Sequence, residues 1–142
     1  MIALCCTQKA LARLRLAPRQ PEPVAPTNAL GHWYVNLLRY GRQEIVMATS
    51  ERSLLTVIFP GGPGLRERLL PELTERTYRL LLAIDAAVAP ARNEVDAMRP
   101  TVWANTASKS VLGSMIDFAF ALPYYLEDGL PTDEIMLHFA DT

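Results

Sequence analysis

Three apolar segments that follow one another between residues 32 and 60 constrain the fold most strongly. Their sequences are HWYVNLLRY, QEIVMATS and SLLTVIFP, and each is rich in β-branched or aromatic residues. Only short GR and SER turns separate them, which favours hairpin connections between neighbouring strands. Successive residues of a strand point to opposite faces of the sheet, and in the first segment the residues of each face are largely apolar. We therefore expect both faces of the sheet to be covered. The segments therefore predict a three-stranded antiparallel meander.

The remaining segments predict two further strands and two main helices. MIALCCT at the start of the chain and TVWANT at 101–106 have the composition of strands, and apolar residues recur at helical spacing over 65–88 and 110–122. We therefore predict the fold class α+β. The predicted sheet is antiparallel, made of the N-terminal strand, the three-strand meander and the later strand, and it packs against the two main helices.

The length and composition fit one domain. At 142 residues and 50% hydrophobic residues, the chain can bury one core, which predicts a single domain over 1–142. Four prolines predict an irregular, Pro-rich surface loop at 17–30. No apolar run approaches the roughly 20 residues of a membrane helix, and no secretory signal pattern is present, so we expect a cytoplasmic protein that does not enter the membrane.

Motifs for cofactors and metals are missing from the sequence. Cys5 and Cys6 are adjacent, too close for ordinary disulfide geometry with each other, and they lack the spacing of a zinc site. We expect them to be reduced strand residues, with a nucleophilic thiol beside His32 or His138 as the alternative. The GGPG run at 61–64 lacks the Gly-Lys-Ser/Thr ending of a phosphate-binding loop. We expect no metal and no cofactor.

A polar stripe interrupts the apolar helix predicted at 110–122. Ser110, Ser114 and Asp117 stand at i, i+4 and i+7 and share one side of the helix, and Gly113 beside them permits close approach of another backbone. Ser108 or Ser110 is a good N-cap for this helix. In the structural interpretation Ser110 caps the helix, Ser114 bonds a carbonyl one turn back and Asp117 faces solvent or pairs with an arginine. In the functional interpretation, Lys109, Ser110 and the first amides of the helix form a site for an anion or a partner.

These motifs together resemble an uncharacterised family of small bacterial proteins that carry a domain of unknown function. The resemblance spans nearly the whole chain, and it is most specific in SKSVLGSMIDFAF. The chain differs from the family pattern at Lys109, where arginine is usual, and at Ile116, where asparagine is usual. The resemblance implies no activity. Its marks are Cys6, Thr7, Lys9, Trp33, Asn36, Arg52, Ser110, Gly113, Ser114 and Asp117.

Charge is distributed unequally along the chain. Residues 1–68 contain nine Lys or Arg and four Asp or Glu, whereas residues 69–142 contain five and eleven. From residue 110 onward there are six acidic residues and no Lys or Arg. We therefore expect a non-catalytic protein that binds a macromolecular partner, most simply another protein or a second copy of itself, through complementary charge. The candidate binding residues are Lys109, Ser110, Ser114, Asp117, Trp33, Asn36, Arg39 and Arg52.

Two alternatives stay open. The first is nucleic-acid binding, with Trp33, Tyr34 or Tyr40 available to stack on bases and the basic N-terminal half neutralising phosphates. The second is an enzyme or binder acting on a small anion at the start of the 110–122 helix, oriented by Lys109, Arg39 or Arg52 with Asp117 as acid or base. The cations of the nucleic-acid alternative are Lys9, Arg13, Arg15, Arg19, Arg39 and Arg42.

Overall fold

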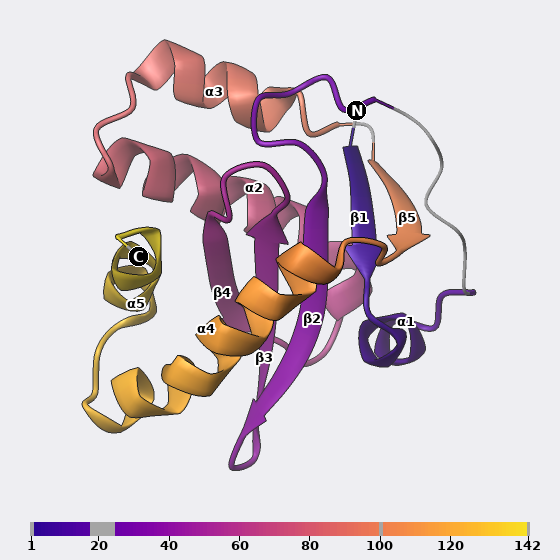
Figure 1. The fold of residues 1–142 in the computed structure, drawn as a ribbon, viewed down its shortest axis with the longest axis vertical. Helices are drawn as coiled ribbons and strands as arrows, with labels where there is room; N and C mark the ends of the chain where they lie inside the picture. Colours follow the sequence, from indigo (N-terminus) through magenta and orange to yellow (C-terminus); the bar gives the residue numbers. More distant parts are fainter. Residues whose placement is uncertain (1, 18–24, 100, 142) are drawn as a thin grey trace.

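The fold is a five-stranded sheet with helices on both faces (Figure 1). The computed structural model describes residues 2–17, 25–99 and 101–141. Within these residues the strand order across the sheet is β4-β3-β2-β1-β5. The strands are β1 (Ile2–Cys6), β2 (Trp33–Tyr40), β3 (Gln43–Ser50), β4 (Thr56–Pro60) and β5 (Thr101–Asn105).

The α+β class and the meander are confirmed. β2 pairs with β3 in antiparallel register from Trp33 opposite Ser50 to Tyr40 opposite Gln43, and β3 pairs in the same way with β4. The prediction of an antiparallel sheet throughout is wrong for β1, which pairs in parallel with both β2 and β5, so the sheet is mixed. The connection from β1 to β2 contains α1 (Gln8–Leu14), and the connection from β4 to β5 contains α2 (Leu65–Ala83) and α3 (Val88–Asp96). A long connection with a helix lets the next strand run in the same direction as the one before it.

Two long helices cover opposite faces of the sheet (Figure 1). Helix α4 (Lys109–Glu127) crosses one face over β2 and β3, and α2 (Leu65–Ala83) lies behind the sheet. The short helices are α1 (Gln8–Leu14), α3 (Val88–Asp96) and α5 (Thr132–Ala140), and α5 packs beside β4 against both long helices. Among the described residues no helix is both long and apolar enough to cross a membrane.

Helix α4 is longer than its sequence pattern predicts. Pro123 marks the expected end of the helix, yet the helix continues through it to Glu127. Proline removes one backbone hydrogen bond, but Leu122 is buried and Tyr125 and Leu126 pack against the core, so packing retains the last turn. The extension matters because it adds Tyr124 and Tyr125 to the surface that α4 presents.

Strand β1 is wholly buried and lies between β2 and β5 in the sheet. Both Cys5 and Cys6 are free thiols in the core, and burial raises the pKa of each to about 12. Their interpretation as reduced strand residues is confirmed. The alternative of a nucleophilic thiol requires a thiolate, and burial disfavours this charged form at both positions. His32 instead accepts a hydrogen bond at Nδ1 from the backbone N–H of Ala3, at 2.8 Å.

A charged cluster ties α1 to the β2–β3 hairpin and to the loop after β4. The Glu44 carboxylate accepts hydrogen bonds from Arg13 Nε at 3.0 Å and from the Gly62 N–H at 3.0 Å. A Cβ atom at Gly61 would collide with this carboxylate and would displace it. Burial alone would raise the pKa of Glu44, but these two hydrogen bonds and the charges of Arg13 and Arg39 outweigh it and hold the pKa below its ordinary value.

Replacing Glu44 with Gln should destabilise the fold in a pH-dependent way. The folded pKa lies below the unfolded value of 4.5, so the carboxylate stabilises the fold above that pH and its contribution is lost as the pH falls through the folded pKa. Chemical unfolding at pH 7 should show a loss of about 1–2 kcal/mol, and the difference from wild type should shrink below about pH 4.5. As a control, Glu75→Gln removes only an exposed pair with Arg79 and should cost under about 0.5 kcal/mol. Equal losses in the two variants would contradict this role.

Candidate functional site

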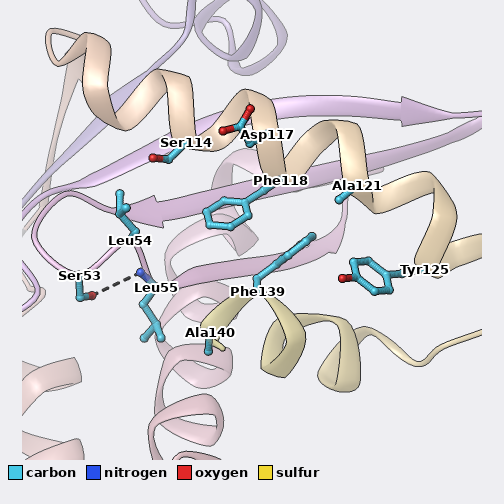
Figure 2. Close-up of a pocket in the computed structure, with 10 residues that line it drawn as sticks. All are labelled: Ser53, Leu54, Leu55, Ser114, Asp117, Phe118, Ala121, Tyr125, Phe139 and Ala140. Atoms are coloured by element: carbon cyan, nitrogen blue, oxygen red, sulfur yellow. Dashed lines mark hydrogen bonds between the residues drawn. The ribbon is translucent and has the colours of Figure 1, made fainter. Parts of the chain in front are cut away.

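A pocket of about 410 Å³ lies between α4, α5 and the turn that joins β3 to β4 (Figure 2). Its wall is mostly apolar, with three aromatic rings and three polar side chains. Ser114 and Asp117, two members of the predicted polar stripe, belong to it. The lining residues are Ser53, Leu54, Leu55, Ser114, Asp117, Phe118, Ala121, Tyr125, Phe139 and Ala140.

Helix α4 presents a continuous side to this pocket. The lining positions 114, 117, 118, 121 and 125 recur at helical spacing, so they share one side of the helix. The helix is fixed at its start by Ser108, whose hydroxyl accepts from the Val111 N–H at 3.2 Å and whose own N–H donates to the Tyr34 hydroxyl at 2.9 Å. Of the two serines expected as possible N-caps, Ser108 is confirmed, and the capping role given to Ser110 is wrong.

The second wall of the pocket is a turn held by hydroxyl groups. Ser50 Oγ and Ser53 Oγ lie 2.6 Å apart, and both accept from the N–H of Leu55. The Leu54 N–H donates to the Ser50 carbonyl, and Leu54 has a φ of 58°. Left-handed backbone is unfavourable for a leucine, and strained residues of this kind are concentrated at functional sites. The turn therefore holds an apolar side chain at the pocket in a conformation that leucine does not favour.

Aromatic rings from α4 and α5 form the third wall. The Phe118 and Phe139 ring centroids are 4.9 Å apart, and Tyr125 meets Phe139 edge-on at 5.8 Å. His138 stacks on Tyr125 with centroids 5.1 Å apart and an interplanar angle of 19°. His138 is therefore a neighbour of the aromatic wall and is not among the residues that line the pocket.

The other predicted binding residues do not meet at this pocket. Trp33 is fully buried, and Asn36 Oδ1 accepts hydrogen bonds from the Thr7 hydroxyl and the Leu37 N–H. Arg39 lies near the tip of the β2–β3 hairpin, whereas Arg52 follows the opposite end of β3 and donates to the Asn28 carbonyl. Lys109 is exposed at the start of α4. The cations of the small-anion alternative are thus dispersed over the fold.

The cations of the nucleic-acid alternative lie mainly around one edge of the sheet. Because β1 and β2 are parallel, α1 and the hairpin tip follow the same ends of these strands. Among the described cations, Arg13 is engaged by Glu44 and by the Gly62 carbonyl. Of the three aromatic residues that could stack on bases, Trp33 and Tyr34 are buried. The exposed members are Lys9, Arg13, Arg15, Arg39 and Arg42, and Arg19 lies outside the described residues.

An exposed apolar stripe on α4 is the surface that the sequence analysis missed. Ile116, Phe120 and Tyr124 are 68%, 75% and 63% exposed and stand at i, i+4 and i+8. The rings of Phe120 and Tyr124 lie 6.5 Å apart. The sequence pattern did indicate this surface. A helix that is apolar over most of its circumference has more apolar surface than one face of a sheet can bury. We call these three residues the α4 stripe.

The pocket has few ionisable groups. Its ionisable side chains are one carboxylate, Asp117, and one phenol, Tyr125, and its lining includes no Lys, Arg, His or Cys. Within the described part of the chain, no group of three or more His, Cys, Asp or Glu residues could hold a metal ion. A nucleophilic mechanism would need a hydroxyl with an activating base at hydrogen-bond distance, and Ser114 forms no hydrogen bond with any described side chain.

A family model described as a domain of unknown function, DUF6933, matches residues 3–141. The resemblance noted in the sequence is therefore confirmed over nearly the whole chain. No curated protein and no solved structure matches. The family description names no activity.

We expect the Leu54 side chain to line the pocket and to contribute little to the stability of the fold. Leu54→Gly removes a partly exposed side chain and relieves left-handed strain of about 1 kcal/mol, so the free energy of unfolding should change by less than about 1 kcal/mol. The matched variant Leu55→Ala removes a buried side chain and should cost about 2–4 kcal/mol. Chemical unfolding measures both. A loss at Leu54 as large as that at Leu55 would show that this side chain mainly supports the core.

Proposed function

We propose that this chain, which belongs to the DUF6933 family, is a non-catalytic cytoplasmic protein that binds a protein partner through the outward surface of α4. The α4 stripe is the observation that carries the proposal. A single exposed apolar residue is ordinary on a protein surface, but three large ones in one line form a contiguous apolar patch. Such patches, and aromatic residues in particular, are concentrated where proteins associate.

The charge around the stripe specifies the partner. The segment from Ser110 to Asp141 contributes six carboxylates and no Lys or Arg, and it forms α5 and all of α4 after Lys109. Three of these carboxylates, Asp117, Glu127 and Asp128, lie on α4 or at its end. Carboxylates near the stripe favour a partner that carries basic residues around an apolar centre, because opposite charges speed encounter and exclude acidic competitors. We therefore expect the partner surface to be basic and apolar.

Nucleic-acid binding remains the second candidate, supported by the cations near α1 and the hairpin tip. It is the weaker one because two of its three stacking residues are buried and Arg13 is held in an internal ion pair. If it is correct, binding of a labelled single-stranded RNA should depend on Arg42 and fall steeply with salt. A small-anion enzyme has less support still, since its proposed cations are dispersed.

Removing the α4 stripe should abolish partner binding without unfolding the protein. The double variant Phe120→Ser/Tyr124→Ser changes two exposed side chains, so its circular dichroism and thermal midpoint should match wild type. A protein that wild type retains from a bacterial lysate should be identified, purified and titrated. Its affinity should fall at least about tenfold in the double variant, and it should weaken with added salt.

The matched control is Val88→Ser, which removes a residue that is 62% exposed on α3 instead. It should leave the affinity unchanged. Equal affinity for wild type and the double variant would contradict the proposal. A salt-independent affinity would contradict the role of charge, and a wild-type dimer that the double variant abolishes would show that the partner is a second copy.

A further inference from the structure

The pocket beside α5 has the size and composition of a small-molecule site. Ligand pockets commonly measure about 300–1,000 Å³ and combine an apolar wall with a few convergent polar groups, and this one has about 410 Å³. Its polar residues on α4, Ser114 and Asp117, stand towards the start of the helix, and Tyr125 lies towards the other end (Figure 2). Asp117 and Tyr125 are eight positions apart, which corresponds to a rise of about 12 Å along a helix axis. The pocket is thus elongated, with its charge near one end.

The two polar groups on α4 are not used by the fold. Ser114 and Asp117 form no hydrogen bond or ion pair with another described side chain, although both line the pocket. Asp117 is exposed to solvent, which is one of the two alternatives of the structural interpretation, and within the described residues it pairs with no arginine. Both groups are available to a ligand.

The electrostatic character of the pocket selects a cation. Asp117 is the one residue of the described lining that carries a formal charge at neutral pH. The two helices that form most of the wall add further carboxylates and, from Ser110 on, no Lys or Arg. Arg52, which precedes the lining turn, directs its guanidinium to the Asn28 carbonyl at 3.0 Å. An anion would meet repulsion here, and a cation would meet an unpaired carboxylate.

The aromatic wall adds a second preference for a cation. Phe118, Tyr125 and Phe139 present three rings that are held against one another at 4.9 and 5.8 Å. The faces of aromatic rings attract ammonium groups, and the attraction grows when the site is shielded from water. Their hydrocarbon surface also favours an apolar ligand body.

We propose that this pocket binds an organic ammonium ion with an apolar body, the ammonium group lying at Asp117 and Ser114 and the hydrocarbon part extending between Phe118, Leu54 and Phe139. The site lies on the α5 side of α4 and is separate from the α4 stripe, so it does not depend on the proposed protein partner. No bond is made or broken in this binding.

Titration calorimetry of the full chain with 4-phenylbutylammonium tests the proposal. The length of this probe suits the span from Asp117 to Tyr125. Two compounds of similar shape serve as controls, 4-phenylbutyrate as the anion and 4-phenylbutanol as the neutral molecule. We expect saturable 1:1 binding of the ammonium ion, at least about tenfold weaker binding of the alcohol, and none of the carboxylate. No binding of the ammonium ion at concentrations up to about 10 mM, or equal binding of all three, would overturn the proposal.

Three variants locate the site. Asp117→Asn removes the charge at an exposed position and should weaken binding at least about tenfold, and Ala121→Phe should block it by filling the pocket. Asp128→Asn removes an exposed carboxylate that follows α4 and is not among the lining residues, and it should change the affinity less than about twofold. Thermal midpoints establish that each variant is folded. An affinity unaffected by Asp117→Asn, or equally reduced by Asp128→Asn, would overturn the assignment.

Discussion

The packing of α4 on β2 and β3 is the contact on which the site depends. Val111, Met115 and Leu122 are the buried residues of this helix, and they anchor it to the sheet. The hydrogen bond from the Ser108 N–H to the Tyr34 hydroxyl fixes where the helix starts. Because the helix is apolar over most of its circumference, the sheet covers only part of it, and α5 covers another part. The pocket and the α4 stripe are the apolar surface that remains.

Because the sheet and α5 cover only part of α4, the helix has two remaining surfaces with different properties. On the α5 side, aromatic rings and the β3–β4 turn enclose a pocket with an unpaired carboxylate. On the outer side, Ile116, Phe120 and Tyr124 are uncovered. Asp117 adjoins both, because it is exposed and also lines the pocket. One helix can therefore contribute to both the proposed ligand site and the proposed protein contact, and Asp117 lies where the two adjoin.

The local sequence pattern predicted most helices and strands well. It did not predict strand direction, the end of α4 or the pocket, because these depend on packing between residues far apart in the chain. The meander follows from three adjacent segments and short turns, which are local signals. The parallel pairing of β1 with β2 and β5 joins residues far apart in the chain, and nothing in MIALCCT specifies the direction of its neighbours. Pro123 predicted the end of α4, but the packing of Leu122 and Tyr125 prevailed over the loss of one hydrogen bond. The spacing of Ser114 and Asp117 correctly placed them on one side of the helix, whereas the pocket that they line also needs α5 and Leu54.

The most direct test of the account is photocrosslinking from the surface of α4 in living cells. A photoreactive phenylalanine analogue in place of Phe120 should give one discrete crosslinked product, because we propose that this side chain is covered by a partner. The same analogue in place of Val88, which is exposed to a similar degree on α3, should give none. No product at Phe120, or the same mixture of products at both positions, would contradict the claim that the uncovered side of α4 is a contact surface.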